Sequence, residues 1–583
     1  MSSTLYMIVA MYIERVPNRN SPPAILLRES FREGGKVRKR TLGNLSSLPA
    51  HQIELIRHVL RDERLTLAED HFEVLSSWHH GHADAVLRAM KRLGLADIIA
   101  SMRSRERDLV LGMVAARVLA PDSKLATTRW WHTTTLPAEL GLTDADEDDL
   151  YDAMDWLLKR QSRIEKKLAA RHLKEGGMVL FDLTSSYFEG VTCPLAARGK
   201  NRDGKEGKLQ VNWGLLTDDR GRPVAVSVFK GNTGDPTTLM PQVRKVKEDF
   251  GIKTMVMVGD RGMITQKQIG ELKGDKENVG IGWITALRTE NIKELVEGES
   301  IQMDLFDERN LFELTHPDYP GERLIACLNP ELRKLRGHKR RSLLDATIRE
   351  LEKVRRMVQR GRLKWNGKAE IGVRVGKGIN KYKMGKHIVL DIQDGYFNFH
   401  VDEKKVAAET ALDGIYVIRA SLDEKSCSAE DLVRHYKMLT QVEQAYRSMK
   451  TIDLEVRPLR HYLEDRVRAH ILLCMLAYYV EWHMRDAWRE LLFCDEDQKA
   501  KKTRDPIAPA ERSEAALRKV HSMVLDDGSE VHSFQTLLAR MSQVVRNLCR
   551  VRSMGPDTPT FTVATTPDAK QRRAYELLER IEV

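Results

Sequence analysis

The first fifty residues alternate between apolar and polar side chains, which is the pattern of strands rather than of helices. Three such stretches are separated by a turn rich in Pro, Asn and Ser and by a Glu-Gly-Gly turn, so residues 1–50 are predicted to form a small β meander. From residue 51 to residue 176 the apolar positions recur at helical spacing, and we expect a helical region there.

Short apolar stretches then alternate with helical patterns between residues 177 and 290. Because strands and helices that alternate in this way build layered sheets, this part is predicted to be a mixed α/β sheet flanked by helices. Residues 291–410 interrupt the sheet with a charged helix, a Gly/Lys-rich stretch and further strand-like segments. The pattern therefore predicts the first part of the core at 177–290, a β-rich basic insertion domain at 291–410, the second part of the core at 411–480 and a helical C-terminal region at 481–583.

Charge changes this picture, because the basic excess lies in one segment. The 583-residue chain has a net charge of +11, whereas residues 331–388 alone contain 19 Lys or Arg against five Asp or Glu. A basic helix can simply be a solvated face, but so much charge within a tenth of the chain favours a polyanionic partner. A membrane-surface role is disfavoured, because the segment lacks a Trp/Phe/Leu face paired with its charges.

Other classes of protein are excluded by what the sequence lacks. No run of about 20 apolar residues is present, so no membrane-spanning helix is predicted. The six cysteines lie far apart without CxxC spacing, which argues against a zinc site and fits a reducing compartment. We expect a cytoplasmic protein of several domains.

Two aspartates have the placement of catalytic carboxylates. Asp182 follows the apolar stretch Val-Leu-Phe, and Asp260 follows Val-Met-Val-Gly. Acidic residues just past buried strands project from the carboxyl edge of a sheet, where active sites of α/β folds collect. Like charges held that close require a cation, and hard oxygen ligands suit Mg²⁺ or Mn²⁺. A lone aspartate at a strand end is more often a turn or cap residue.

A third acidic residue lies in a helical pattern over residues 429–449. Tyr436, Glu443 and Lys450 are seven residues apart, and Arg447 is four residues after Glu443. Two helical turns return a side chain to nearly the same azimuth, so one face is predicted to present all four. An exposed, salt-bridged helix face would have the same spacing.

Together these motifs resemble bacterial insertion-sequence DDE transposases with the Y-R-E-K signature, in the insertion-sequence-four superfamily. Phe-Asp182-Leu-Thr is similar to the first aspartate motif, Gly-Asp260-Arg-Gly-Met to the second, and the order Asp, Asp, Glu with an insertion before the glutamate is that of the family. The resemblance covers residues 177–480. One position departs from the signature, because Leu439 stands where the family has an arginine. Either that phosphate contact is lost, or Arg447 supplies it.

The resemblance implies a ribonuclease H-like core in which Asp182, Asp260 and Glu443 hold two Mg²⁺ or Mn²⁺ ions. It implies cleavage and strand transfer at the terminal inverted repeats of an element, target DNA as a second partner, and a homodimer that joins two ends. The helical region 51–176 is expected to bind the DNA ends. Tyr436, Arg447 and Lys450 are expected to grip DNA phosphates, with Arg261 as a further candidate.

Trp365, within the basic insertion, is the candidate for stacking on a flipped base, although a buried tryptophan of the insertion core would fit as well. Two other functions remain open at this stage. A ribonuclease H-fold nuclease that does not join DNA would share all three carboxylates, and a transposase-derived DNA-binding regulator would have no activity.

Overall fold

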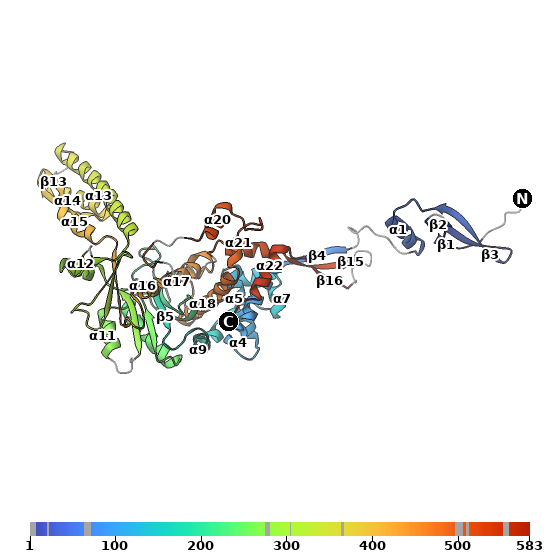
Figure 1. The fold of residues 1–583 in the computed structure, drawn as a ribbon, viewed down its shortest axis with the longest axis horizontal. Coiled ribbons are helices and arrows are strands. Elements are labelled where there is room, and N and C mark those ends of the chain that lie inside the picture. Colours follow the sequence, from blue (N-terminus) through green and yellow to red (C-terminus); the bar gives the residue numbers. More distant parts are fainter. Residues whose placement is uncertain are drawn as a thin grey trace. The chain divides into compact units, whose positions relative to one another are not determined.

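The computed structural model describes residues 7–19, 22–62, 72–274, 280–302, 305–362, 367–495, 505–508, 512–551 and 559–582. Contacts divide the chain into two units, one made of residues 1–77 and 546–564 and the other of residues 78–545 and 565–583 (Figure 1). The candidate catalytic residues all belong to the second unit.

The first unit contains two small sheets. The N-terminal strands form the predicted antiparallel meander in the order β1-β2-β3, and a helix follows them. The other sheet has the order β16-β15-β4 and joins strands from both ends of the sequence, a long-range pairing that local patterns did not reveal. The elements are β1 (Met7–Val16), β2 (Ala24–Glu33), β3 (Lys36–Asn44), α1 (Ala50–Leu60), β4 (Phe72–His79), β15 (Val545–Val551) and β16 (Phe561–Ala564).

Helices dominate the start of the second unit. Their ends follow the capping residues of the sequence: Ser104 accepts a hydrogen bond from the N–H of Arg107, and Asp146 forms a capping box with Asp149. Helix α5 is buried along most of its length, as its nearly continuous apolar sequence requires. The helices are α3 (Gly81–Arg92), α4 (Leu95–Ile99), α5 (Arg105–Leu119), α6 (Lys124–Trp130), α7 (Leu136–Leu140), α8 (Glu147–Leu158) and α9 (Gln161–His172).

An eight-stranded mixed sheet forms the centre of the second unit, with the order β10-β11-β14-β9-β8-β5-β6-β7. β5, β6 and β7 are antiparallel, whereas β8 and β9 run parallel to β5. Two antiparallel strands on one side of the first strand and two parallel strands on the other make the ribonuclease H-like core that the resemblance predicted. The strands are β5 (Met178–Tyr187), β6 (Gln210–Thr217), β7 (Pro223–Lys230), β8 (Met255–Val258), β9 (Ile281–Ala286), β10 (Leu311–Leu314), β11 (Arg323–Leu328) and β14 (Ile415–Ala420).

Two strands of this sheet come from the segment predicted as an insertion. β10 pairs with β11, β11 pairs with β14, and β14 pairs with β9. The first part of the insertion therefore belongs to the central sheet, and only the later part lies outside it. The part outside the sheet is mainly helical and not β-rich as predicted. It has its own small core, in which Leu351, Val354, Ile371 and Phe397 pack together. Its elements are α13 (Pro330–Gln359), α14 (Lys368–Tyr382), β12 (Ile388–Gln393), β13 (Tyr396–Val401) and α15 (Glu403–Ala411).

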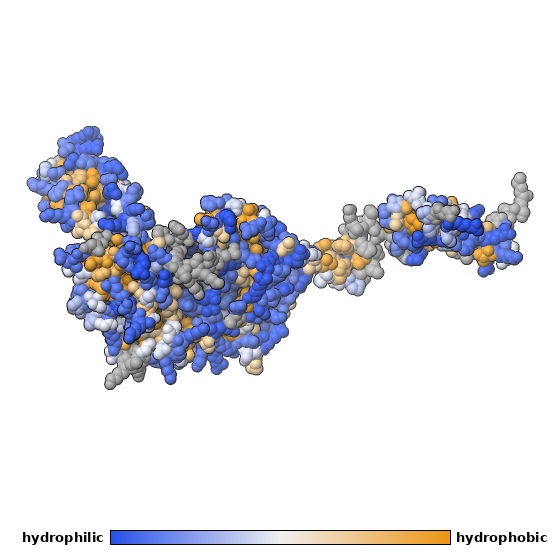
Figure 2. Space-filling model, viewed as in Figure 1, coloured by the Kyte–Doolittle hydropathy of each residue, from blue (hydrophilic) through white to orange (hydrophobic). Residues whose placement is uncertain are grey.

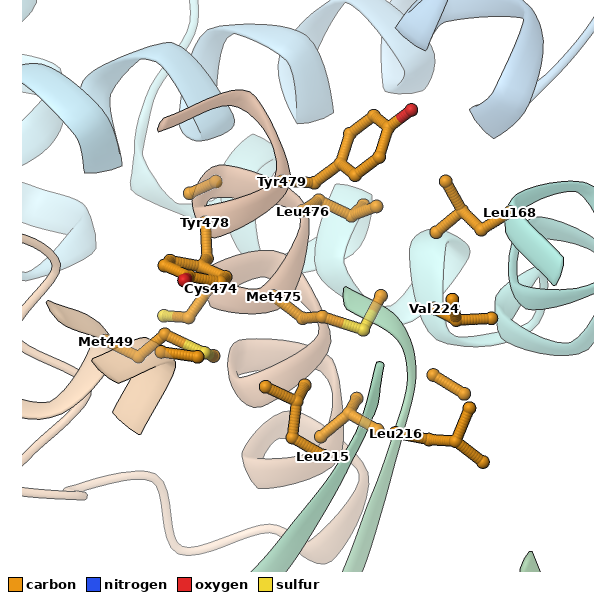
Figure 3. Close-up of a cluster of buried hydrophobic side chains, with 14 of the residues drawn as sticks. Leu168, Leu215, Leu216, Val224, Met449, Cys474, Met475, Leu476, Tyr478 and Tyr479 are labelled. Carbon is orange, nitrogen blue, oxygen red and sulfur yellow. The ribbon is translucent and has the colours of Figure 1, made fainter. Parts of the chain in front are cut away.

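Helix α18 (Glu464–Ala487) carries the main hydrophobic core. Its residues Met475 and Leu476 lie with Leu215 of β6 and Leu168 of α9 in one buried cluster (Figure 3). The middle of the helix is apolar on all sides and is enclosed by the sheet and by α5 and α8. Its dense apolar stretch is therefore that of a buried core helix. The remaining helices are α10 (Leu239–Arg244), α11 (Gln266–Gly274), α12 (Thr289–Glu297), α16 (Ala429–Lys437), α17 (Leu439–Arg447), α20 (Glu514–Ser522), α21 (Phe534–Ser542) and α22 (Ala569–Leu578).

Two expectations about composition can be compared with the structure. Within the described ranges, no helix is both long and apolar enough to cross a membrane. All six cysteines are free thiols, and five of them are buried.

Candidate active site

Asp182 and Asp260 occupy equivalent positions on neighbouring parallel strands. Leu180 of β5 and Val258 of β8 are register partners, and each aspartate lies two residues further along its chain. Asp260 follows the end of β8, as predicted, but Asp182 lies in the middle of β5 and not past its end. The strand continues to Tyr187 because β6 pairs with it over that length, while β8 has already ended.

Both aspartates have the same local hydrogen bond. Oδ1 of Asp182 accepts the N–H of Leu183 at 2.8 Å, and Oδ1 of Asp260 accepts the N–H of Arg261 at 2.7 Å. This bond fixes the rotation of each side chain and leaves Oδ2 available. A Cβ placed on Gly262 would lie 3.5 Å from Oδ2 of Asp260, so the glycine keeps the surroundings of that oxygen open.

Glu443 reaches the same site from α17, where it is exposed. Burial is the main cause that raises the pKa of the Asp182 carboxyl to about 7, and the charges of Asp260 and Glu443 act in the same direction. Burial also raises the pKa of the Tyr436 phenol, again with contributions from all three carboxylates. The structure therefore brings these four predicted residues within electrostatic range of one another. The charge of Arg261 opposes the rise in the pKa of Tyr436, so Arg261 lies within electrostatic range of the same group.

Lys450 is placed differently from the prediction. The chain from Ser448 to Ile452 is a π-helical turn, which changes the rotation per residue after Glu443. Lys450 is consequently only 7% exposed, although Glu443 and Arg447 are exposed. Its Nζ lies 2.5 Å from Oδ1 of Asp203 and 3.1 Å from Oγ1 of Thr184. The side chain points into the protein and not along the face of Glu443.

The other predicted residues are less informative. Arg447 is exposed, and no ion pair of its side chain is formed with the residues that the structure describes. Leu439, at the position of the signature arginine, packs against the core. Trp365 lies outside the described residues, so its stacking role stays a prediction.

Sequence reasoning missed two residues at this site. Arg202 lies in the connection between β5 and β6, and its Nη2 donates to Oδ1 of Asp235 at 2.5 Å. Its positive charge lowers the pKa of Asp182 against the effect of burial. Asp235 is close to Asp260, because its Oδ2 would lie 3.8 Å from a Cβ on Gly262. Arg202 lies in irregular structure and Asp235 begins a short 3-10 helix, so no hydrophobic pattern marks either residue.

The donor set fits a hard divalent cation by its chemistry, because carboxylate oxygens are the ligands that Mg²⁺ and Mn²⁺ prefer. Within the described parts of the chain, however, no three His, Cys, Asp or Glu side chains are already arranged closely enough to hold a metal ion.

The chain was compared with family models, curated proteins and solved structures. A family model described as the transposase DDE domain matches residues 179–480, which is more than half of the chain. The model of the N-terminal domain of IS1634 family transposases matches residues 13–69. The cryo-EM structure of a piggyBac transposase synaptic complex with hairpin DNA is similar over 79% of this chain and 77% of that chain, with 9% identity and a TM-score of 0.35. No curated protein matches the chain.

Proposed function

Because the chain belongs to the family of DNA transposases with a DDE domain, whose members use divalent metal ions, we propose that Asp182, Asp260 and Glu443 are its catalytic carboxylates. They would hold two Mg²⁺ or Mn²⁺ ions, with Asp182 shared and Asp260 and Glu443 each on one ion. The reaction is DNA cleavage at the ends of an insertion sequence, followed by strand transfer into target DNA.

The equivalent register of Asp182 and Asp260 supports this proposal most directly. Asp182 and Asp260 hold the same position relative to paired residues of adjacent parallel strands, so the two lie side by side where β8 ends. The burial that raises the pKa of the Asp182 carboxyl also lowers the stability of the folded protein. Carboxyl groups with such raised pKa values are found mainly at functional sites.

The protein's own residues have separate tasks in the reaction. Metal ions held by the carboxylates would activate the attacking oxygen and stabilise the leaving 3′ oxygen. Glu443 is exposed on α17 and can move toward Asp182 and Asp260 by a change of rotamer. Tyr436 keeps its proton at neutral pH, so its hydroxyl can donate a hydrogen bond to a phosphate oxygen. Arg261 supplies a positive charge beside it.

The DNA partners are the terminal inverted repeats of the element and its target site. A homodimer is proposed because the two ends must be cut together and joined to one target. The basic insertion would contact phosphates outside the active site, where exposed cations contribute affinity without reading sequence. The helical region 51–176 is proposed to bind the ends.

The test uses a duplex that carries the inverted repeat read from the DNA flanking the gene. Asp182→Asn, Asp260→Asn and Glu443→Gln should each abolish Mg²⁺-dependent cleavage and leave binding of the duplex nearly unchanged. Asp249→Asn removes an exposed carboxylate at the end of the helical segment Lys245–Asp249 and serves as the matched control. Mg²⁺-dependent cleavage by the Asp260→Asn protein would refute the assignment.

A second substrate separates transposition from its alternatives. A duplex end that already has a free 3′-hydroxyl should be joined to a supercoiled plasmid by the wild-type protein. Cleavage of the intact end without this joining would identify a nuclease, and binding without either reaction would identify a regulator.

A further inference from the structure

Two side chains cross from the helical segment of Glu443 to strand β5. Tyr446 is three residues after Glu443 and Lys450 is seven residues after it, and each residue is 7% exposed. Both reach the half of β5 that begins at Asp182. The segment is therefore fixed to the strand at two points, by Tyr446 just before its π-helical turn and by Lys450 within that turn.

Tyr446 makes the first connection inside the sheet itself. Asp182 and Leu215 are register partners of β5 and β6, and the hydroxyl of Tyr446 lies between them. It accepts the N–H of Leu215 at 3.0 Å and donates to the main-chain carbonyl of Asp182. The ring meets Trp213 edge to face, with centroids 5.1 Å apart. The Tyr446 hydroxyl thus stands between the N–H of Leu215 and the carbonyl of Asp182, where a direct hydrogen bond between the two strands would otherwise form.

Lys450 makes the second connection. Its Nζ donates to Oγ1 of Thr184, two residues after Asp182, and forms the ion pair with Asp203. Asp203 is 1% exposed in its side chain and also accepts the N–H of Tyr187 at 2.9 Å. The lysine therefore joins the Glu443 segment to both the strand and the connection that carries Arg202.

These contacts decide between two roles for Lys450. A lysine that grips DNA has to leave Asp203, which would remain buried with Arg457 as its other ion-pair partner. Removing one partner of a buried ion pair is costly, because the other charge stays desolvated. An exposed cation would contact a phosphate without that cost. The environment fits a lysine that acts within the protein.

We propose that Tyr446 and Lys450 are positioning residues that lock the Glu443 segment to strand β5, and that Lys450 does this in place of contacting DNA. This inference rests on the proposed function, since it assumes that Glu443 and Asp182 share a cation. The lock sets their separation, and its loss should weaken cation binding without removing a DNA contact.

The experiment compares Lys450→Gln and Tyr446→Phe with Lys267→Gln, which removes an exposed lysine of α11. Mn²⁺ is titrated into the full-length protein without DNA and followed by calorimetry. Binding of the element-end duplex is measured in Ca²⁺ over a series of salt concentrations. Lys450→Gln and Tyr446→Phe should weaken Mn²⁺ binding by about tenfold, on the scale of one lost charge-assisted or buried hydrogen bond. The salt slope of DNA binding should equal that of the wild type for both.

Opposite results would overturn the inference. A salt slope that falls by about one in Lys450→Gln, with unchanged Mn²⁺ affinity, would make Lys450 a phosphate contact. If Lys450→Gln does not fold, Tyr446→Phe keeps the ring and its packing, and unchanged Mn²⁺ affinity in that variant would equally overturn the lock. Failure of the proposed function is distinguishable, because cleavage would then survive Asp182→Asn, whereas here cleavage still requires Asp182.

Discussion

Arg202 and Asp235 form an ion pair at 2.5 Å beside the candidate catalytic carboxylates. The guanidinium uses Nη2 for this pair, while Nη1 is buried and has no hydrogen-bond partner among the described residues. Its charge also acts on Asp182. Without DNA or metal, Arg202 therefore places a positive charge next to Asp235 and near Asp182.

Replacing Arg202 should strengthen cation binding. A cation approaching the carboxylates is repelled by the guanidinium, so Arg202→Gln is expected to bind Mn²⁺ several-fold more tightly, roughly threefold to tenfold for a screened charge at this range. Calorimetry without DNA measures this, and Arg198→Gln, in the same connection but exposed, is the control. Weaker Mn²⁺ binding by Arg202→Gln would mean that the arginine organises the ligands rather than opposing the ion.

Asp182 should reduce the stability of the metal-free protein. Its carboxyl is buried near two like charges, and Asn has the same shape without the charge. We expect Asp182→Asn to raise Tm in EDTA by about 1–3 °C, the scale of one or two kcal/mol in a unit of this size. Mn²⁺ should raise the Tm of the wild type and not of the variant, because only the wild type binds the ion in its folded state. A lower Tm for Asp182→Asn in EDTA would contradict this account.

Helix α13 carries a stripe of exposed basic side chains. Arg349, Lys353, Arg356 and the C-cap residue Arg360 are spaced i, i+4, i+7 and i+11, opposite the face that packs in the insertion core. The surface over this helix is predominantly hydrophilic (Figure 2). If the stripe tracks DNA phosphates, replacing all four by Gln should lower the log–log salt slope of binding by about three to four.

The control for this stripe has the same charge change on the same helix. Arg333, Lys334, Arg336 and Lys339 are exposed but distributed around the first turns of α13. Replacing these four by Gln should change the slope less than replacing the stripe. Equal slopes for the two quadruple variants would show that only the total charge of the insertion matters.

Local patterns in the sequence were sufficient for the elements that carry the candidate site. Alternation and apolar runs located the strands of Asp182 and Asp260, and helical spacing located Glu443. These features are properties of a few neighbouring residues, which is why one sequence reveals them. The three motifs together also predicted the family and, through it, the ribonuclease H-like sheet.

Features that depend on distant residues could not be predicted in this way. The spacing from Glu443 to Lys450 predicts one face only if the helix stays regular, and the π-helical turn removes that condition. The strand pairing of the sheet brings three residues of connecting segments to the site, namely Arg202, Asp203 and Asp235. Their local sequence does not encode that pairing. The pairing of β4 with β15 joins residues more than 450 positions apart, and no local period encodes it.

The buried Glu481 should make stability depend on pH. Burial is the main cause that raises its pKa to about 7, against the opposing charge of Arg485, whose Nε donates to it at 2.6 Å. Between the ordinary value of 4.5 and 7, the folded protein binds more protons than the unfolded chain, so stability falls as pH rises through that window.

Glu481→Gln should remove this dependence. Wild-type stability should be lower at about pH 7.5 than at about pH 5 by on the order of 1–3 kcal/mol more than that of the variant. Urea unfolding at the two pH values measures the difference, and Glu248→Gln, an exposed carboxylate, provides the control. An identical pH dependence in wild type and Glu481→Gln would show that Glu481 stays ionised throughout.

The last prediction concerns the arginine that the signature has and this chain lacks. Leu439 packs against the core and cannot donate a hydrogen bond, whereas Arg447 is exposed one turn after Glu443. A guanidinium can hold two phosphate oxygens at once and an ammonium cannot, so Arg447→Lys should slow single-turnover cleavage of a labelled element end by about tenfold or more. Adding Leu439→Arg to that variant should recover part of the loss, because it restores a guanidinium one turn before Glu443. Wild-type rates for a folded Arg447→Lys protein would make Arg447 an ordinary surface charge and leave the signature contact without a replacement on this helix.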